Sequence, residues 1–194
     1  MIGRLPAAEF FLFRCRKRVG SFVLRALSAN EEPVMSKIVP CLWFKGDAEE
    51  AANFYVSLLP NSRVETVQRS PIDTPSGAAG SVLVVEFTLA GQRFMGLNGG
   101  TKVEHTDAVS FKIGCEDQAE VDRLWDALCA NGGQPVQCGW LKDRWGMRWQ
   151  IVPDAMMRYL ASPDRAAANR AMAAMMKMVK LDLEGLRRAY EAVT

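Results

Sequence analysis

Glu86 is the residue with the clearest capacity for chemistry, because it is the lone acid in the apolar run SVLVVEFTL at residues 81–89. A carboxylate that is buried in a protein must be paired, hydrogen-bonded or protonated. Pairing with Arg148, or a hydrogen bond to Gln150, would give Glu86 a structural role. Otherwise Glu86 could act as a general base or orient a ligand, so it is the catalytic candidate.

The segment DRWGMRWQIV at 143–152 predicts a tight turn followed by a strand with one polar side. Strand alternation places Arg148 and Gln150 on that polar side and sends Trp149 and Ile151 towards a helix. The same reasoning, which also sends Trp43 towards the helix, predicts a pocket wall of Leu42, Phe44, Val84, Thr88, Lys112, Arg148 and Gln150. The predicted ligand-binding residues are Phe44, Glu86, Lys112, Cys138, Trp140, Arg148 and Gln150.

For two of these candidates, a structural role is an alternative to a role in the site. Cys138 could be a nucleophile, but a small apolar role is favoured because no histidine stands near it in the sequence to activate the thiol. Trp140, like Trp145, lies on a turn segment and could line an aromatic rim or pack in the core.

An internal repeat must position these side chains. At an offset of 70 residues, Asp47 aligns with Asp117 and Tyr55 aligns with Trp125. Both aspartates are predicted helix N-caps, and apolar residues follow each of them at helical spacing. Each helix is followed by three strand-like runs, namely 63–69, 81–89 and 93–97, then 135–138, 141–142 and 147–152. The repeat predicts an α+β protein with two tandem βαβββ modules.

We expect the modules at 35–104 and 105–160, and a helical C-terminal tail at 161–194. Helices are predicted near 164–178 and 182–193, where the first has an apolar stripe of Met172, Met175, Met176 and Val179. This stripe would pack on the sheet or on a second subunit, or else form a methionine-lined lid over a ligand.

Residues 1–34 differ from the rest, with six Arg/Lys and three Glu. An upstream start, with Met35 as the true first residue, is favoured. A poorly ordered or partner-binding arm and a targeting segment are the alternatives, although RCRKR interrupts the apolar patches that a secretory signal needs.

Several blocks in this order resemble the vicinal-oxygen-chelate superfamily of glyoxalase I, bleomycin-resistance proteins and extradiol dioxygenases. They include PCLWFKGDAEEAANFYVSLLPNS, VEFTLAGQRFMGLNGG and GGQPVQCGWLKDRWGMRWQIVP. The closer likeness is to its PhnB-like branch, labelled 3-demethylubiquinone-9 3-methyltransferase-type proteins. The resemblance covers about residues 37–190 and implies that the two modules form a curved mixed sheet around a cup. It also implies that a small molecule binds in this cup, either as sequestration or with an enzymatic activity that the sequence does not name.

Metal-using members of this superfamily place ligands on the first and last strands of each module. The resemblance puts Pro40, Glu86, Ser110 and Gln150 at those positions. Only Glu86 is a good ligand for a divalent transition metal, since such ions favour imidazole, thiolate or several carboxylates. Alternation would turn the Cys41 thiol to the opposite face. We therefore predict no metal and no cofactor, with a metal-dependent glyoxalase or dioxygenase as an alternative.

The composition of the chain argues against some classes of binding partner. The net charge is +2 and residues 35–194 hold 18 basic against 19 acidic side chains, so a nucleic-acid groove is not expected. Five cysteines without a C-x-x-C pair favour reduced thiols and a cytoplasmic protein. No apolar run reaches membrane-spanning length, and the single histidine, His105, is predicted to be a solvated loop residue.

We expect a small-molecule ligand and a homodimer. Methyl transfer, which the family label implies, remains an alternative, although the sequence lacks the G-x-G type loop that nucleotide-like cofactors often use.

Overall fold

A computed structural model describes residues 36–100 and 104–192, so the predicted extension 1–34 and Met35 lie outside the described residues. The predicted order of strand, helix and three strands occurs twice. The first module contains β1 (Cys41–Phe44), α1 (Ala48–Leu58), β2 (Arg63–Arg69), β3 (Val82–Leu89) and β4 (Gln92–Asn98). The second contains β5 (Phe111–Cys115), α2 (Gln118–Cys129), β6 (Gln134–Pro135), β7 (Trp140–Lys142) and β8 (Arg148–Pro153), with a short 3₁₀ turn at Ala130–Gly132. The predicted α+β class is confirmed.

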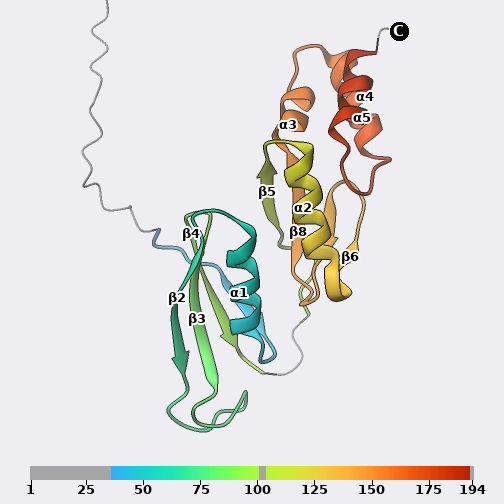
Figure 1. Ribbon diagram of the computed structural model, residues 1–194. Coiled ribbons are helices and arrows are strands. Elements are labelled where there is room, and N and C mark those ends of the chain that lie inside the picture. Colours follow the sequence, from blue (N-terminus) through green and yellow to red (C-terminus); the bar gives the residue numbers. More distant parts are fainter. Residues whose placement is uncertain (1–35, 101–103, 193–194) are drawn as a thin grey trace, which may run out of the picture. The chain divides into compact units, whose positions relative to one another are not determined.

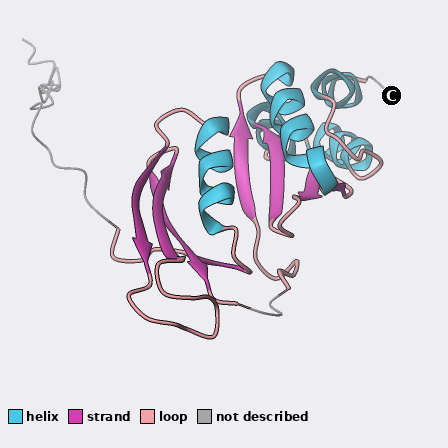
Figure 2. Cartoon of the chain, turned by 60° about the horizontal axis from the view of Figure 1, so that its bottom comes forward, coloured by secondary structure: helices cyan, strands magenta, loops and turns pink. Residues whose placement is uncertain are grey.

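Each module forms a four-stranded mixed sheet with the same strand order, β1-β4-β3-β2 and β5-β8-β7-β6 (Figure 1). The first and last strands of each module are parallel neighbours, and the other pairs are antiparallel. Helix α1 covers one face of the first sheet and α2 covers one face of the second (Figure 2). We call the other face of each sheet, which α1 or α2 does not cover, its open face.

Both helices form because apolar residues recur at helical spacing, but their N-termini are capped differently. Asp117 accepts a hydrogen bond from the Glu120 N–H at 2.8 Å, as predicted for a cap. Asp47 stands at the N-cap position of α1, as predicted, but its side chain makes no such bond. Instead, the buried Asn98 of β4 accepts from the Ala48 N–H at 3.0 Å and donates to the Val82 carbonyl.

Three helices follow β8, one more than the sequence predicted. They are α3 (Asp154–Leu160), α4 (Arg165–Met175) and α5 (Leu183–Glu191), which pack on one another. Helix α3 lies within 105–160, the range expected for the second module. Met175 packs against a small core of Val152, Met156, Leu181 and Leu186, whereas the side chains of Met172 and Met176 are exposed. The methionine stripe is therefore divided between a tail core and the surface. None of the described helices is long and apolar enough to cross a membrane.

Candidate functional site on the open faces of the two sheets

The side chains of strand β1 point to the opposite sides of the sheet from those predicted. Leu42 and Phe44 are buried on the α1 side, while Cys41 and Trp43 lie on the open face. The cause is the connector between strand and helix, which has three residues in the first module (45–47) and two in the second (116–117). An offset of 70 aligns the helices but misaligns the first strands by one residue, and a one-residue shift reverses every side chain. Phe44 and Leu42 are therefore removed from the pocket wall.

Glu86 lies on the open face of the first sheet, and its side chain is 34% exposed. One carboxylate oxygen accepts a hydrogen bond from the Thr66 hydroxyl at 3.0 Å, and the other lies 3.8 Å from the Arg93 guanidinium. The predicted partners, Arg148 and Gln150, are wrong. Glu86 is a half-exposed acid in a local ion pair, so the burial that motivated its catalytic role is not observed.

Cys41 shares this face with Glu86, because both are cross-strand partners of Met95 in β4. The prediction that alternation turns Cys41 away is therefore wrong. Burial raises the pKa of the Cys41 thiol, which disfavours the thiolate that a metal or a nucleophilic reaction needs.

The open face of the second sheet gathers four of the seven predicted ligand-binding residues. Lys112 and Trp140 are both cross-strand partners of Gln150, and Lys142 stands opposite Arg148. Gln150 donates from its amide nitrogen to the Ser110 hydroxyl at 2.8 Å. The face thus combines cations, an amide and an indole on three adjacent strands.

Arg148 is the most firmly held of these groups. Its Nε donates to the Asp107 carboxylate and its Nη1 donates to the Gly146 carbonyl at 3.2 Å. Its side chain is only 17% exposed, which limits the directions in which the guanidinium can point.

The four positions matched to metal ligands do not form a donor set. Ser110 and Gln150 bond to each other, Glu86 pairs with Arg93, and Pro40 has no donor side chain. Within residues 36–100 and 104–192, no group of three or more His, Cys, Asp or Glu side chains could hold a metal ion. The residues present do not fit a transition metal, which prefers imidazole and thiolate ligands.

Two further predicted positions have other contacts. The Cys138 sulfur lies 3.8 Å from the Met176 sulfur, and the Cys138 N–H donates to the Met178 carbonyl, which ties this turn to the tail. His105 is half-buried, with Nε2 3.0 Å from the Trp43 carbonyl oxygen and its ring edge-on to Phe44. His105 therefore lies in a loop, as predicted, but its ring is half-buried and not fully solvated.

Asp143 is the residue that sequence reasoning missed. It is almost fully buried and accepts hydrogen bonds from the Tyr55 hydroxyl at 2.7 Å and the Trp149 indole at 2.8 Å. It also accepts from the backbone N–H groups of Trp145 and Met147. Burial and the Asp143 carboxylate raise the pKa of Tyr55 well above its ordinary value, so Tyr55 stays a donor. This turn fastens the second module to α1 and fixes where β8 begins. An aspartate two residues before the Trp145-Gly146 pair of the predicted turn was the available signal.

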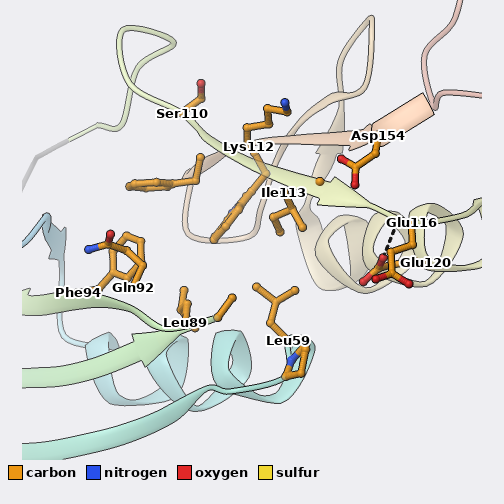
Figure 3. Close-up of a pocket in the computed structure, with 15 residues that line it drawn as sticks. Leu59, Leu89, Gln92, Phe94, Ser110, Lys112, Ile113, Glu116, Glu120 and Asp154 are labelled. Atoms are coloured by element: carbon orange, nitrogen blue, oxygen red, sulfur yellow. Dashed lines mark hydrogen bonds between the residues drawn. The ribbon is translucent and has the colours of Figure 1, made fainter. Parts of the chain in front are cut away.

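A groove of about 570 Å³ runs between the two modules along β5 (Figure 3). Leu59 and Leu89 of the first module face Ile113 of the second across it, while Ser110 and Lys112 point away from its centre. Gln92, Glu116, Glu120 and Asp154 add polar groups to the lining. The groove is thus mainly apolar and adjoins the open face through β5.

The comparisons with known proteins agree with this architecture. Residues 36–152 match the family described as 3-demethylubiquinone-9 3-methyltransferase. The chain belongs to this family. A PhnB protein from Bacillus cereus, described with the same methyltransferase name, is 33% identical, with a TM-score of 0.56 over 61% of this chain and 99% of its own. A structure of a protein from Pseudomonas aeruginosa is 22% identical, with a TM-score of 0.50 over 61% of this chain and 99% of its own.

The resemblance to PhnB-like, 3-demethylubiquinone-9 3-methyltransferase-type proteins is therefore confirmed. A comparison with curated proteins finds no match to the chain.

Proposed function

We propose that this family member binds a small organic molecule on the open face of its second sheet, without a metal ion. The observation that carries the proposal is the convergence of Lys112, Gln150, Trp140 and Arg148 on one face that α2 leaves uncovered. A few polar groups beside aromatic and apolar surface are what small-molecule sites usually present.

The adjoining groove supports this proposal. Its volume of about 570 Å³ lies within the usual range for ligand pockets, and Ser110 and Lys112 contribute both to its lining and to the open face. The apolar walls lie on the helix side of β5, opposite Lys112, so a ligand that contacts both would pass over the edge of this strand.

A thermal-shift screen tests the proposal. Metabolites and aromatic drugs are screened with and without a chelator, and hits are repeated on Trp140→Ala and Gln150→Ala. Hits should be insensitive to the chelator, and both variants should lose them. Gln68→Ala is the matched control, because Gln68 lies on the first sheet, opposite Val84. A ligand that stabilises both site variants as much as the parent would overturn the proposal.

We further propose a cytoplasmic homodimer in which the open face of one copy's first sheet covers the second sheet of its partner. The first open face carries Trp43, 36% exposed, beside the half-buried Leu97 and Val84. Such an apolar face is typical of an interaction surface. Sedimentation of Trp43→Gln should show a smaller species than the parent, and equal sedimentation would contradict the dimer.

Methyl transfer is the competing function, because the family description names it. The sequence contains no G-x-G type loop after a strand for a nucleotide-like methyl donor. S-adenosylmethionine should therefore leave the melting temperature unchanged, and a saturable stabilisation would favour the enzyme.

A further inference from the structure

We propose that the molecule bound on the open face of the second sheet is a small organic anion, with a carboxylate or phosphoryl group on an apolar or aromatic body. This inference rests on the proposed function and adds the chemical class of the ligand. It follows from how the cations of this face are arranged and compensated.

Three cations occupy neighbouring positions on the sheet. Lys142 stands directly opposite Arg148 in the antiparallel β7–β8 pair, and Lys112 stands opposite Gln150, two residues further along β8. Directly opposed side chains have Cβ atoms about 5 Å apart and diagonal ones about 7 Å apart, so Arg148 on the central strand lies close to each lysine on the flanking strands. A ligand anchored at Arg148 could therefore contact the ammonium group of either lysine. Like charges placed opposite each other destabilise a sheet.

The face holds too few acids to balance these charges. Asp107 pairs with Arg148, but among the described residues neither Lys112 nor Lys142 takes part in an ion pair or a side-chain hydrogen bond. Lys180, by contrast, is paired with Asp122 at 2.8 Å on the flank of α2. The open face therefore keeps two uncompensated ammonium groups next to a partly compensated guanidinium, which is the electrostatic arrangement that an anionic ligand would complete.

Arg148 and Trp140 provide contacts for the two parts of such a ligand, the anionic group and the apolar body. Arg148 is held by Asp107 and the Gly146 carbonyl through Nε and Nη1, and its Nη2 donates to no described residue. A guanidinium with a free edge can donate to a carboxylate or phosphoryl oxygen. Trp140, beside Gln150 in the same row, offers an indole surface for an apolar or aromatic body.

A matched pair of fluorescent probes tests the charge requirement. 8-Anilinonaphthalene-1-sulfonate carries one anionic group, and N-phenyl-1-naphthylamine is the same ring system without it. The full-length parent protein should bind the anionic probe saturably and at least about fivefold more tightly than the neutral probe. Raising the salt from about 0.05 M to about 0.5 M should weaken only the anionic probe.

Charge-removing variants locate the site. Lys112→Gln and Lys142→Gln should each weaken the anionic probe about three- to tenfold and leave the neutral probe unchanged. Lys45→Gln is the control, since it removes the same charge from an exposed lysine between β1 and α1. Thermal melts of each variant verify that it is folded.

The other outcomes are distinguishable. Equal affinity for both probes, with no effect of either variant, would overturn the anion inference while the small-molecule proposal stands. If neither probe binds saturably, the proposed function fails together with the inference. If the variants leave probe binding intact but dissociate a dimer, the cations serve carboxylates of a second copy and the anion inference is wrong.

Discussion

The open faces of the two sheets share one backbone plan and differ in chemistry. On the first sheet, Glu86 is paired with Arg93 and the remaining surface around Trp43 is largely apolar. On the second sheet, Lys112 and Lys142 have no ion pair among the described residues, and they flank Gln150 and Arg148. The duplicated module has therefore kept its fold while its two copies present different surfaces. The contrast supports a recognition role for the second sheet and a covering role for the first.

The largest expected effect comes from breaking the link between the modules. Asp143→Ala leaves the Tyr55 hydroxyl and the Trp149 indole buried without an acceptor. Losing several hydrogen bonds to a buried carboxylate should lower the free energy of unfolding by about 3–5 kcal/mol, measured in urea. Tyr55→Phe, which removes one donor, should cost about 1–2 kcal/mol. A loss below about 1 kcal/mol for Asp143→Ala would contradict the role of this turn.

A substitution on the second open face should change the free energy of unfolding less, and should raise it. Lys142→Gln removes one of two like charges that stand opposite each other, so it should raise the free energy of unfolding by about 0.5 kcal/mol. The same variant should weaken anion binding. A stability gained together with lost binding is typical of residues retained for function. Destabilisation by Lys142→Gln would show instead that the lysine supports the fold.

The smallest change in the free energy of unfolding is expected for a substitution on the first open face. Glu86→Gln breaks a 3.8 Å ion pair between half-exposed side chains, and the amide can still accept from Thr66. The free energy of unfolding should fall by about 0.5 kcal/mol or less, and probe binding should not change. Urea unfolding and the probe titration measure both. A marked loss of probe binding with unchanged stability would show that Glu86 takes part in ligand binding. The two open faces would then not differ in function as proposed.

The repeat shows how far pattern reasoning reaches in this chain. Strand β2 and helix α2 lie close to their predicted positions because their polar and apolar residues alternate or recur at a clear period. Strand β3 does so because it is a short apolar run rich in valine. Strand β1 reads Cys-Leu-Trp-Phe, with no polar residue to mark a face, so strand alternation could not fix its orientation. One extra residue in the first connector was enough to reverse it.

In the candidate site too, some neighbours were predictable from the sequence and others were not. Lys112, Arg148 and Gln150 were predicted to share a wall, and the register of β5 with β8 places Lys112 directly opposite Gln150. The partner of Glu86 was not predictable, because Arg93 and Thr66 become its neighbours only through the pairing of β2, β3 and β4. Asp143 was not predictable either, since its donor Tyr55 lies 88 residues away in the chain.

The sequence by itself determined the two-module order, the helices over each sheet and the polar character of β8, since each depends on local periodicity and composition. Only the tertiary structure decided which face of β1 is buried, which cations remain unpaired and which carboxylate joins the modules. The physical reason is that charge compensation and buried hydrogen bonds depend on contacts between distant strands. A single residue in a connector changes those contacts while leaving the local pattern almost the same.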